Sequence, residues 1–470
     1  MRRTTTPDPR PRLRLWAVAG PRVATTPVTA PRRRAVAGPG IATTPVTAPR
    51  RRAVAGAGIT ATLLAAALVA SGTPALAAAP VATSAELPTA PRTPRAPLVL
   101  SLPAPTGERP IGTVTLHLVD RTRPDPLLRS RPYRELMVSL WYPAKEAPGL
   151  PLAPQMSRRA AADWDKNSAP PMGIKSGAVD WAATRTHARV GAPVDRPAGG
   201  LPVVVFAPGD GGPRTLGTVL VEELASRGYL VVSVDHTYEA DQVEFPGGRV
   251  ERALPLPEKL TEDVIAALIR KHSRARVADM RFVLDRLTSL RQGNNPDADS
   301  VPLPPGLLGS VDRSRIGMLG QSLGGSVAAQ LLHDDPRVAA GVNLDGGYVG
   351  PVARTGVAKP FLQMASEPHT RETEPTWKSF WDRSTGWKRE LRLTGARHGS
   401  FTDLQALFPQ LTGTLKNLPD AELIGTIDPR RSVAAQRAYV TAFFDLHLKG
   451  RPTHLFDRPD RRHPEVKAIP

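Results

Sequence analysis

The sequence contains no cysteine among its 470 residues. This absence excludes disulfide bonds, thiolate metal sites and a cysteine nucleophile. The H-E-x-x-H, EF-hand and phosphate-loop strings are also missing, and the acids and histidines between His236 and Asp241 are too loosely spaced to predict a metal site. We therefore expect neither a metal nor another cofactor.

Acidic residues are scarce at the start of the chain. The segment 1–80 is rich in arginine and holds a single acid, Asp8, whereas acids nearly balance the basic residues in the remainder. More than half of the formal net charge of +19 therefore lies in this segment, in part as arginine triplets at 32–34 and 50–52. Because a nucleic-acid binder clusters its basic residues on a folded face or recognition motif, we expect no nucleic-acid partner.

The segment 1–79 has the features of a leader. A Val-Ala-Gly motif recurs there at even spacing, and an apolar run over 53–70 follows the second arginine triplet. Basic residues, an apolar run and the small-residue site Ala75-Leu-Ala77 form the order of a secretory signal, which predicts a signal peptide within 50–79 and export of the protein. An uncleaved membrane anchor over 53–70 is the alternative, although that run is short for a span.

Composition also predicts the domain boundaries. Residues 80–108 are rich in proline, alanine and threonine and show no apolar periodicity, as expected of a linker. The remaining residues, 109–470, have the hydrophobic content of a folded domain and are long enough to form one large catalytic domain.

Two kinds of strand are predicted at the start of this domain. Residues 113–118 and 135–142 alternate between apolar and polar side chains, as half-buried antiparallel strands do. Residues 203–206 and 230–234 are continuous apolar runs, as central parallel strands require. This contrast predicts an α/β fold with a mostly parallel sheet and antiparallel N-terminal edge strands.

Helices alternate with further strands along the rest of the chain. We expect an amphipathic helix over 215–227, ended by Gly228, a long helix over 261–290 and a last helix over 432–448. Four more strands are expected, at residues 315–319, 338–344, 360–365 and 389–393. This β-α alternation predicts a doubly wound sheet whose site lies at the carboxyl ends of the strands.

A G-x-S-x-G motif follows the predicted strand 315–319. It reads Gly320-Gln-Ser322-Leu-Gly324, and a helix of small residues starts near Ser326. Strand, motif and helix form the context of a nucleophile elbow, in which the serine sits on a strained turn and Gly320 and Gly324 leave room for the backbone. A glycine-rich turn without catalytic function is the alternative reading.

A nucleophilic serine needs a histidine base and a carboxylate that orients it. In hydrolases with an α/β sheet of the predicted kind, the chain order is serine, acid, histidine. Asp345 closes the predicted strand 338–344, and His398 lies in the loop after the strand 389–393. Asp334 and Asp335 end a helix and are expected to face solvent. A surface position is likewise expected for the other histidines after Asp345, which are His369, His447, His454 and His463.

Two backbone amides are needed to bind the oxyanion of the tetrahedral intermediate. One should come from Leu323, the residue after the predicted nucleophile, and the other from the glycine-containing loop 206–212 that follows the strand 203–206. An ordinary β-to-α turn is the alternative for that loop.

Several blocks occur in the order found in one known family. They are Leu140-Trp-Tyr-Pro143, Phe206-Ala-Pro-Gly-Asp-Gly-Gly-Pro-Arg-Thr215, Leu224-Ala-Ser-Arg-Gly-Tyr229, Val234-Asp-His236 and Phe401-Thr-Asp403. With these blocks and the serine motif, the sequence from about 136 to 449 resembles the plasma-type platelet-activating factor acetylhydrolases, or lipoprotein-associated phospholipases, in a bacterial secreted form.

The resemblance implies an α/β-hydrolase fold with Ser322 as nucleophile, Asp345 as acid and His398 as base. It also implies that the N–H groups of Asp210 and Leu323 bind the oxyanion, so that the carboxylate of Asp210 must point away from it. The implied reaction is metal-independent hydrolysis of short acyl esters, including the sn-2 acetyl group of phospholipids. The implied partners are a small ester or phospholipid and a transient lipid surface, without an obligate protein partner.

Two other functions stay open at this point. One is a broad lipase or cutinase-like polyester hydrolase, because the fold does not determine the substrate. The other is a non-catalytic module that binds a surface. The aromatic residues Trp377, Phe380, Trp381 and Trp387 could line an acyl pocket or cap the fold.

Overall fold

The computed structural model describes residues 96–415 and 418–470. The predicted leader 1–79, with its signal peptide or anchor, and the first part of the predicted linker lie outside the described residues. Within the described ranges, every helix is too short or too polar to cross a membrane.

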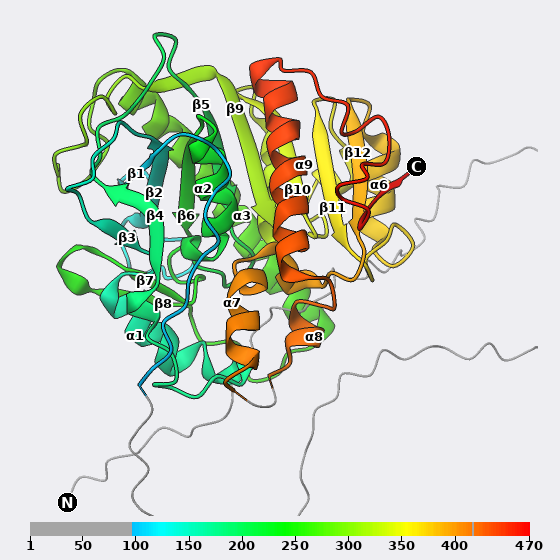
Figure 1. The fold of residues 1–470 in the computed structure, drawn as a ribbon, viewed down its shortest axis with the longest axis horizontal. Helices are drawn as coiled ribbons and strands as arrows, with labels where there is room; N and C mark the ends of the chain where they lie inside the picture. The colour runs from blue at the N-terminus through cyan, green and yellow to red at the C-terminus, as the bar shows by residue number, and fades with distance from the viewer. Residues whose placement is uncertain (1–95, 416–417) are drawn as a thin grey trace, which may run out of the picture. The chain divides into compact units, whose positions relative to one another are not determined.

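A single large sheet organises the chain (Figure 1). Its strands, in sheet order, are β13 (Val466–Ile469), β12 (Lys388–Leu393), β11 (Phe361–Ser366), β10 (Val338–Leu344), β9 (Val311–Gln321), β5 (Leu201–Ala207), β6 (Leu230–Asp235), β2 (Arg134–Pro143), β1 (Ile111–Asp120), β4 (Arg185–Val190) and β3 (Leu152–Pro154). The strands from β12 to β6 are parallel, whereas β2 is antiparallel to both β6 and β1. The predicted mostly parallel sheet with an antiparallel N-terminal edge is confirmed.

The burial of the strands follows from what covers them. Every residue of β5 and β6 is buried, because helices lie on both faces of the parallel part of the sheet. In β1, buried residues alternate in part with less buried ones, as expected near an edge. The strand β13 was not predicted, because a short segment in a polar tail gives too weak a pattern; it pairs antiparallel with β12.

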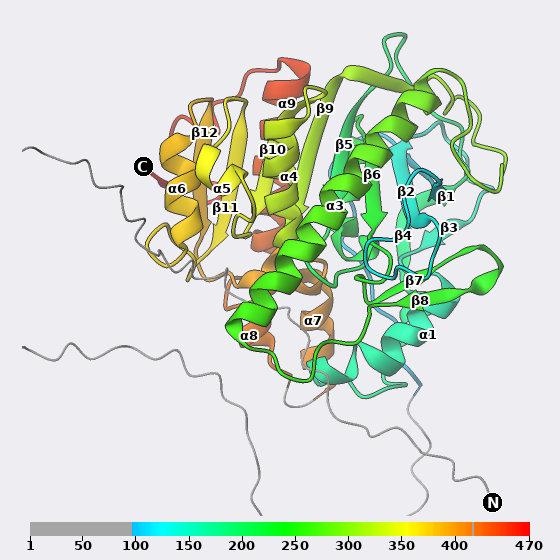
Figure 2. The same cartoon turned by 180° about the vertical axis from the view of Figure 1, so that it is seen from behind.

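Helices cover the two faces of the sheet. On one face lie α2 (Thr218–Ser226) and α9 (Pro429–Lys449), and on the other lie α3 (Glu262–Arg291), α4 (Leu323–Asp334), α5 (Val352–Thr355) and α6 (Pro375–Arg383) (Figures 1 and 2). The predicted long helix is α3, which begins after the N-cap Thr261, whose hydroxyl accepts the N–H of Val264. The predicted last helix is α9.

A smaller layer closes the carboxyl end of the sheet. It contains α1 (Arg158–Asn167), α7 (Leu404–Thr412), α8 (Asp420–Leu423) and the hairpin of β7 (Gln242–Glu244) and β8 (Val250–Arg252) (Figure 1). Short 3₁₀ helices complete the list: η1 (Pro170–Met172), η2 (Trp181–Ala183), η3 (Arg214–Gly217), η4 (Pro246–Gly248) and η5 (His398–Phe401). Part of this layer shares a core of its own, in which the rings of Trp164 and Trp181 meet edge to face at 6.0 Å.

The predicted amphipathic helix 215–227 differs from the structure. Its first residues form η3, and α2 is buried along its whole length rather than on one face. The reason is a covering segment: Glu223, on the outer side of α2, accepts the N–H of Thr106 at 2.7 Å and pairs with Arg227 at 2.6 Å. Amphipathicity was therefore the wrong prediction for this helix.

The covering segment is the C-terminal part of the predicted linker. Leu98 exchanges backbone hydrogen bonds with Ala178 and Asp180, at 2.9 and 2.8 Å, and Leu100 and Leu102 are buried. Residues 98–108 thus belong to the folded domain, and the linker prediction is wrong for them. The alternation of leucines at 98, 100 and 102 was the available signal.

The order of the strands leaves a crevice between the loops that follow β5 and β9, where a functional site can form. Chain connections run from β5 to β6 on one side and from β9 to β10 on the other, while β5 and β9 are neighbours. At such a switch point the loops after the two strands turn in opposite directions and leave a crevice between them. The segments that follow Ala207 and Gln321 meet at this crevice.

Candidate active site

Ser322 follows β9 directly and precedes α4. Its backbone has φ 55° and ψ −125°, a region that L-residues rarely adopt, and its N–H donates to the Leu344 carbonyl at 2.8 Å. A Cβ atom at Gly320 would collide with the backbone of Gly324, and one at Gly324 would collide with the carbonyl of Ala207. The motif therefore folds as the strained strand-to-helix turn that the sequence predicts, and only glycine fits at both positions.

Asp345 follows β10, the neighbour of β9. Its carboxylate is buried, with Oδ2 2.7 Å from His398 Nδ1 and Oδ1 accepting the N–H of Ser366 at 2.7 Å. Burial by itself would raise the pKa of Asp345. The hydrogen bonds from His369 and His398 outweigh burial and hold this pKa well below its usual value of 3.8, so Asp345 is negatively charged.

His398 opens η5, after β12. Its Nδ1–H donates to Asp345, and its Nε2 lies 3.2 Å from the side-chain nitrogen of Gln321, the residue before Ser322. This tautomer leaves a lone pair on Nε2, which a general base requires. In the described part of the chain no hydrogen bond joins Ser322 Oγ to His398; the Gln321 amide occupies that nitrogen instead.

His369 does not lie where the sequence analysis placed it. Its Nδ1 is 2.9 Å from Oδ1 of Asp345, its side chain is 23% exposed, and its ring meets Trp377 edge to face at 6.0 Å. The prediction of a surface role was wrong, because the loop after β11 turns back over the end of β10. A histidine shortly after a strand adjacent to β10 was the signal that could have found it.

The expected oxyanion groups lie at the crevice. Leu323 is the first residue of α4, where a backbone N–H has no acceptor within the helix. The loop after β5 lies close to the serine, since a Cβ atom at Gly209 would come within 3.2 Å of Ser322 Cβ. The carboxylate of Asp210 points to α3, where Oδ1 is 2.7 Å from His272 Nδ1.

A buried arginine anchors the loop after β5. Arg276 of α3 donates through Nη2 to the carbonyl of Gly209 at 2.8 Å, through Nη1 to the carbonyl of Pro208, and through Nε to Glu239 at 2.7 Å. Both charged side chains are fully buried. Sequence reasoning missed Arg276, because one basic residue in a long polar helix carries no distinguishing pattern.

Two groups of potential metal ligands occur among the described residues. In each, the ligand atoms lie within 4.8 Å of one another; the groups are Asp345, His369 and His398, and Asp210, Glu239 and His272. In the first group both Nδ1 atoms already meet carboxylate oxygens, and in the second Glu239 is paired with Arg276. The protein therefore supplies the charge and hydrogen-bond partners of both groups itself.

The predicted aromatic group does not form one pocket. Trp377 is buried and donates its indole N–H to the Gly346 carbonyl at 2.8 Å, and Phe380 stacks on Tyr348 with ring centroids 3.9 Å apart. These two rings cap the loop that carries Asp345. Trp381 instead lies beneath cationic side chains, and Trp387 packs against the last helix.

The remaining acids and histidines lie away from the serine. Asp334 and Asp335 pair with arginines at the end of α4, at 3.0 and 2.7 Å. Asp334 is partly exposed, but Asp335 is buried, so the prediction that it faces solvent was wrong. His454 is exposed, as predicted, whereas His463 is only 15% exposed. His447 is also misplaced by the prediction, because it packs against Trp387 with ring centroids 4.5 Å apart.

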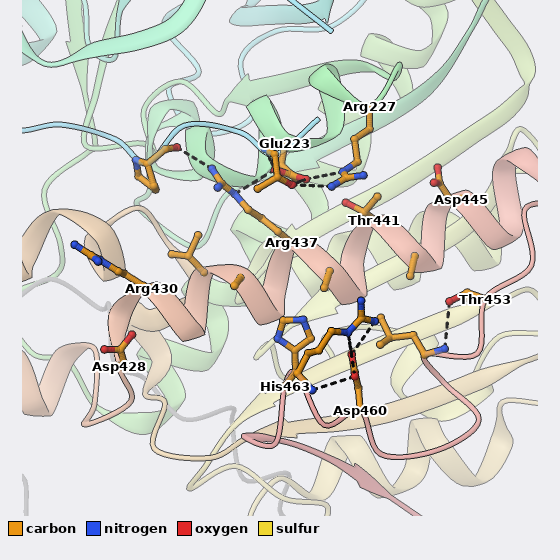
Figure 3. Close-up of a pocket in the computed structure, with 18 of the residues that line it drawn as sticks. Glu223, Arg227, Asp428, Arg430, Arg437, Thr441, Asp445, Thr453, Asp460 and His463 are labelled. Carbon is orange, nitrogen blue, oxygen red and sulfur yellow. Dashed lines mark hydrogen bonds and ion pairs between the residues drawn. The ribbon is translucent and has the colours of Figure 1, made fainter. Parts of the chain in front are cut away.

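A large cavity of the described residues lies elsewhere. Its volume is about 1760 Å³, and it runs along α9 between residues 101–106 and 451–463 (Figure 3). Its walls carry ion pairs such as Glu223 with Arg227 and Asp460 with Arg462. None of the three predicted triad residues lines this cavity.

Comparison with known proteins agrees with this architecture. The family described as platelet-activating factor acetylhydrolase, isoform II, matches residues 175–454, which is more than half of the chain. A probable 1-alkyl-2-acetylglycerophosphocholine esterase of Arthroderma benhamiae is 29% identical over 57% of this chain and 66% of its own length. The platelet-activating factor acetylhydrolase of Gallus gallus is 25% identical over 54% and 63%. The chain thus spans just under two thirds of these curated relatives.

A solved structure covers more of the chain. The ferulic acid esterase from Streptomyces cinnamoneus is 37% identical, with a TM-score of 0.65, over 79% of this chain and 99% of that structure. Together with the strand order, this likeness confirms the expected α/β-hydrolase fold. The chain belongs to the platelet-activating factor acetylhydrolase, isoform II, family.

Proposed function

We propose that the protein is a serine ester hydrolase that acts through an acyl-enzyme. One observation carries this proposal: His398 donates to the buried Asp345 through Nδ1 and presents Nε2 to the residue before Ser322. A base held in this tautomer beside a serine on a strained turn is the arrangement that activates a hydroxyl. The nucleophilic role of Ser322 and its partners' roles are part of the proposal.

The reaction follows from these positions. The Gln321 amide leaves His398 Nε2, Ser322 Oγ attacks the acyl carbonyl carbon, and His398 takes the serine proton. Asp345 stabilises the imidazolium, and the N–H groups of Leu323 and Asp210 bind the oxyanion. The alcohol leaves with the proton from His398; water then attacks the acyl-enzyme with His398 as base, which releases the acid and restores Ser322.

The substrate we favour is an ester of a short acyl group, including the acetyl group at the sn-2 position of a phospholipid. The names of the relatives in Arthroderma benhamiae and Gallus gallus support an acetyl-phospholipid substrate.

A second candidate is an esterase of broader or bulkier acyl specificity, of the lipase or cutinase-like kind. The likeness to a ferulic acid esterase favours it, because that likeness has the higher identity and covers nearly all of the other chain. An acid as large as ferulate needs a wider acyl pocket than acetate does.

The test is a set of initial rates with the full chain on esters of one alcohol, with acyl groups from acetyl to palmitoyl and with a feruloyl ester. The matched control is Ser322→Ala. A steep preference for acetyl that the control abolishes supports the favoured substrate, and a maximum at feruloyl or at long chains supports the second candidate. Full activity of the control contradicts the serine mechanism.

We also propose that the protein is exported, with residues 1–79 as leader. The N-terminal sequence of protein recovered from the culture medium tests this: a start after residue 77 supports cleavage, and a start at Met1 in the membrane fraction supports the anchor.

A further inference from the structure

The carboxylate of Asp345 has four polar partners. Nδ1 of His369 lies 2.9 Å from Oδ1, which also accepts the N–H of Ser366 at 2.7 Å. Oδ2 accepts the Nδ1–H of His398 at 2.7 Å and the hydroxyl of Ser366 at 2.9 Å. The proposed reaction uses only His398. The second imidazole, His369, therefore has no assigned role.

The surroundings of His369 come from four segments. Asp345 follows β10, the ring of His398 lies 6.0 Å from its own ring, and the Ser366 hydroxyl is 3.4 Å from its Nδ1. Trp377 meets it from α6. Two more charges act on it, those of Glu374 and Arg397. With 23% of its side chain exposed, His369 exchanges protons with solvent while the carboxylate of Asp345 is fully buried.

Two physical effects follow from this contact. First, a donor on Oδ1 fixes the plane of the carboxylate, so that Oδ2 stays aligned with His398 Nδ1. Second, a proton on His369 places a positive charge against the same carboxylate, which then stabilises a positive charge on His398 less well. The two imidazoles therefore compete for one negative charge.

We propose that His369 is a positioning residue of the acid–base pair, which orients Asp345 toward His398 and, when protonated, weakens the support that Asp345 gives to a charged His398. This inference rests on the ester hydrolase proposed above. It gives the enzyme a second proton-sensitive group, one that acts through Asp345 without touching the substrate.

The electrostatics of the site agree with this role. Burial disfavours the charged form of His369, but the hydrogen bond and charge of Asp345 outweigh burial and raise the pKa of His369 above its ordinary 6.5. His369 is therefore charged over more of the mildly acidic range than a free histidine. A charge on His369 acts on His398 because both rings contact one carboxylate.

The experiment compares three forms of the full chain over pH 4.5 to 9 with a neutral acetyl ester. His369→Asn keeps a donor near the position of Nδ1 but cannot take up a proton, whereas His369→Ala loses both properties. The matched control is His454→Asn, in a surface pair where His454 Nδ1 lies 3.2 Å from Asp457. Denaturant midpoints of all forms show that they are folded.

The expected result separates the two effects. The acidic limb of kcat/KM needs two apparent ionisations in the wild type and in the control, but one in both His369 variants. At the pH optimum, His369→Ala loses about tenfold in kcat with KM nearly unchanged, and His369→Asn recovers most of that loss.

Other results overturn the inference. A wild-type profile and rate in His369→Ala would leave His369 without a role, and a loss as large as in Ser322→Ala would make it a base rather than a positioning residue. Failure of the proposed function has a different signature, which is esterase activity that is absent or survives in Ser322→Ala.

Discussion

The pairs Asp345–His398 and Asp210–His272 lie beside the crevice with the same separation and different surroundings. Asp345 and His398 are 2.7 Å apart, as are Asp210 and His272. In the first pair the far nitrogen of the ring faces Gln321 beside the serine. In the second pair the histidine comes from α3, near Glu239 at 3.9 Å, and its partner belongs to the loop after β5. The close contact of an acid with a histidine therefore does not identify that histidine as a catalytic base. What identifies the base is the group that its second ring nitrogen faces, which for His398 is Gln321 beside the serine.

A third pair strengthens this conclusion. His236 Nδ1 lies 2.9 Å from Asp279, and both side chains are fully buried beside Arg134, which also binds Asp279. Burial disfavours a charge on His236 and lowers its pKa. This pair lies in the core, so we assign it to the fold.

The largest effect is expected when the pair of Asp345 and His398 is broken. His398→Ala should lower kcat by about 10³-fold or more, because no base then takes the serine proton and no acid protonates the leaving alcohol. Initial rates on an acetyl ester measure this, with His236→Ala and His272→Ala as matched removals of an imidazole. A loss in either of those variants as large as in His398→Ala would contradict the assignment of the base.

The next largest effect is expected when the loop after β5 loses its anchor, Arg276. Arg276→Met should lower kcat by about 10²-fold, because the carbonyls of Pro208 and Gly209 lose their donors and the loop loses its position. It should also lower the free energy of unfolding by about 3 to 5 kcal/mol, since Glu239 is left buried without its partner.

A double variant separates these two consequences. Arg276→Met with Glu239→Gln should recover much of the stability, because the unpaired charge is gone, but not the rate, because the loop carbonyls still lack donors. Urea midpoints and kcat measure the two quantities. Recovery of both together would show that Arg276 acts on stability alone.

A smaller effect is expected when the pair of Asp210 and His272 is broken. His272→Ala should lower kcat by about tenfold with little change in KM, and His272→Asn should retain most of the rate because it keeps a donor for Asp210. Rates on the acetyl ester at a fixed pH measure this, and an effect on KM alone would place His272 in substrate binding instead.

The same pair predicts a pH dependence of stability. Burial opposes the charge on His272, but Glu239 and Asp210 outweigh burial and raise its pKa above 6.5. A raised folded-state pKa gives stability that is complete below 6.5 and lost as the pH rises through the folded-state value. The difference in urea midpoint between wild type and His272→Asn should shrink over that range; a difference that grows with pH would contradict this.

The smallest effect concerns a histidine without an acid. Burial beside Trp387 and Phe443 lowers the pKa of His447 to about 4. The wild type should therefore lose stability as the pH falls from 6.5 to about 4, because the unfolded chain takes up the proton first. His447→Leu should reduce this loss in urea titrations, and an unchanged loss would show that other groups cause it.

The sequence predicted best those features that follow from single strands. Ser322 and Asp345 stand just after apolar runs, and His398 lies in the loop after the strand Lys388–Leu393. Parallel strands bring such positions to one edge of the sheet. The catalytic roles of these residues remain a proposal, but their placement at one end of the sheet was predictable from periodicity alone.

Features that depend on the path of loops were not predictable in this way. His369 reaches the site on a loop, and Arg276 is one basic residue among several in a long helix, so neither belongs to a distinguishing periodic pattern. The segment 98–108 looked like a linker because prolines flank its three leucines. The burial of α2 followed from the same segment, since no local property of a helix reveals what packs on its outer face.

The most direct test of the account is the rate at which a 4-nitrophenyl phosphonate labels the full chain, followed by intact mass and peptide mapping. We predict one adduct, on Ser322, which forms at least about 10³-fold more slowly in His398→Ala, only about tenfold more slowly in His272→Ala and not at all in Ser322→Ala. Equal labelling rates in wild type and His398→Ala, or an adduct on another residue, would contradict the assignment of Asp345 and His398 as the pair that activates Ser322.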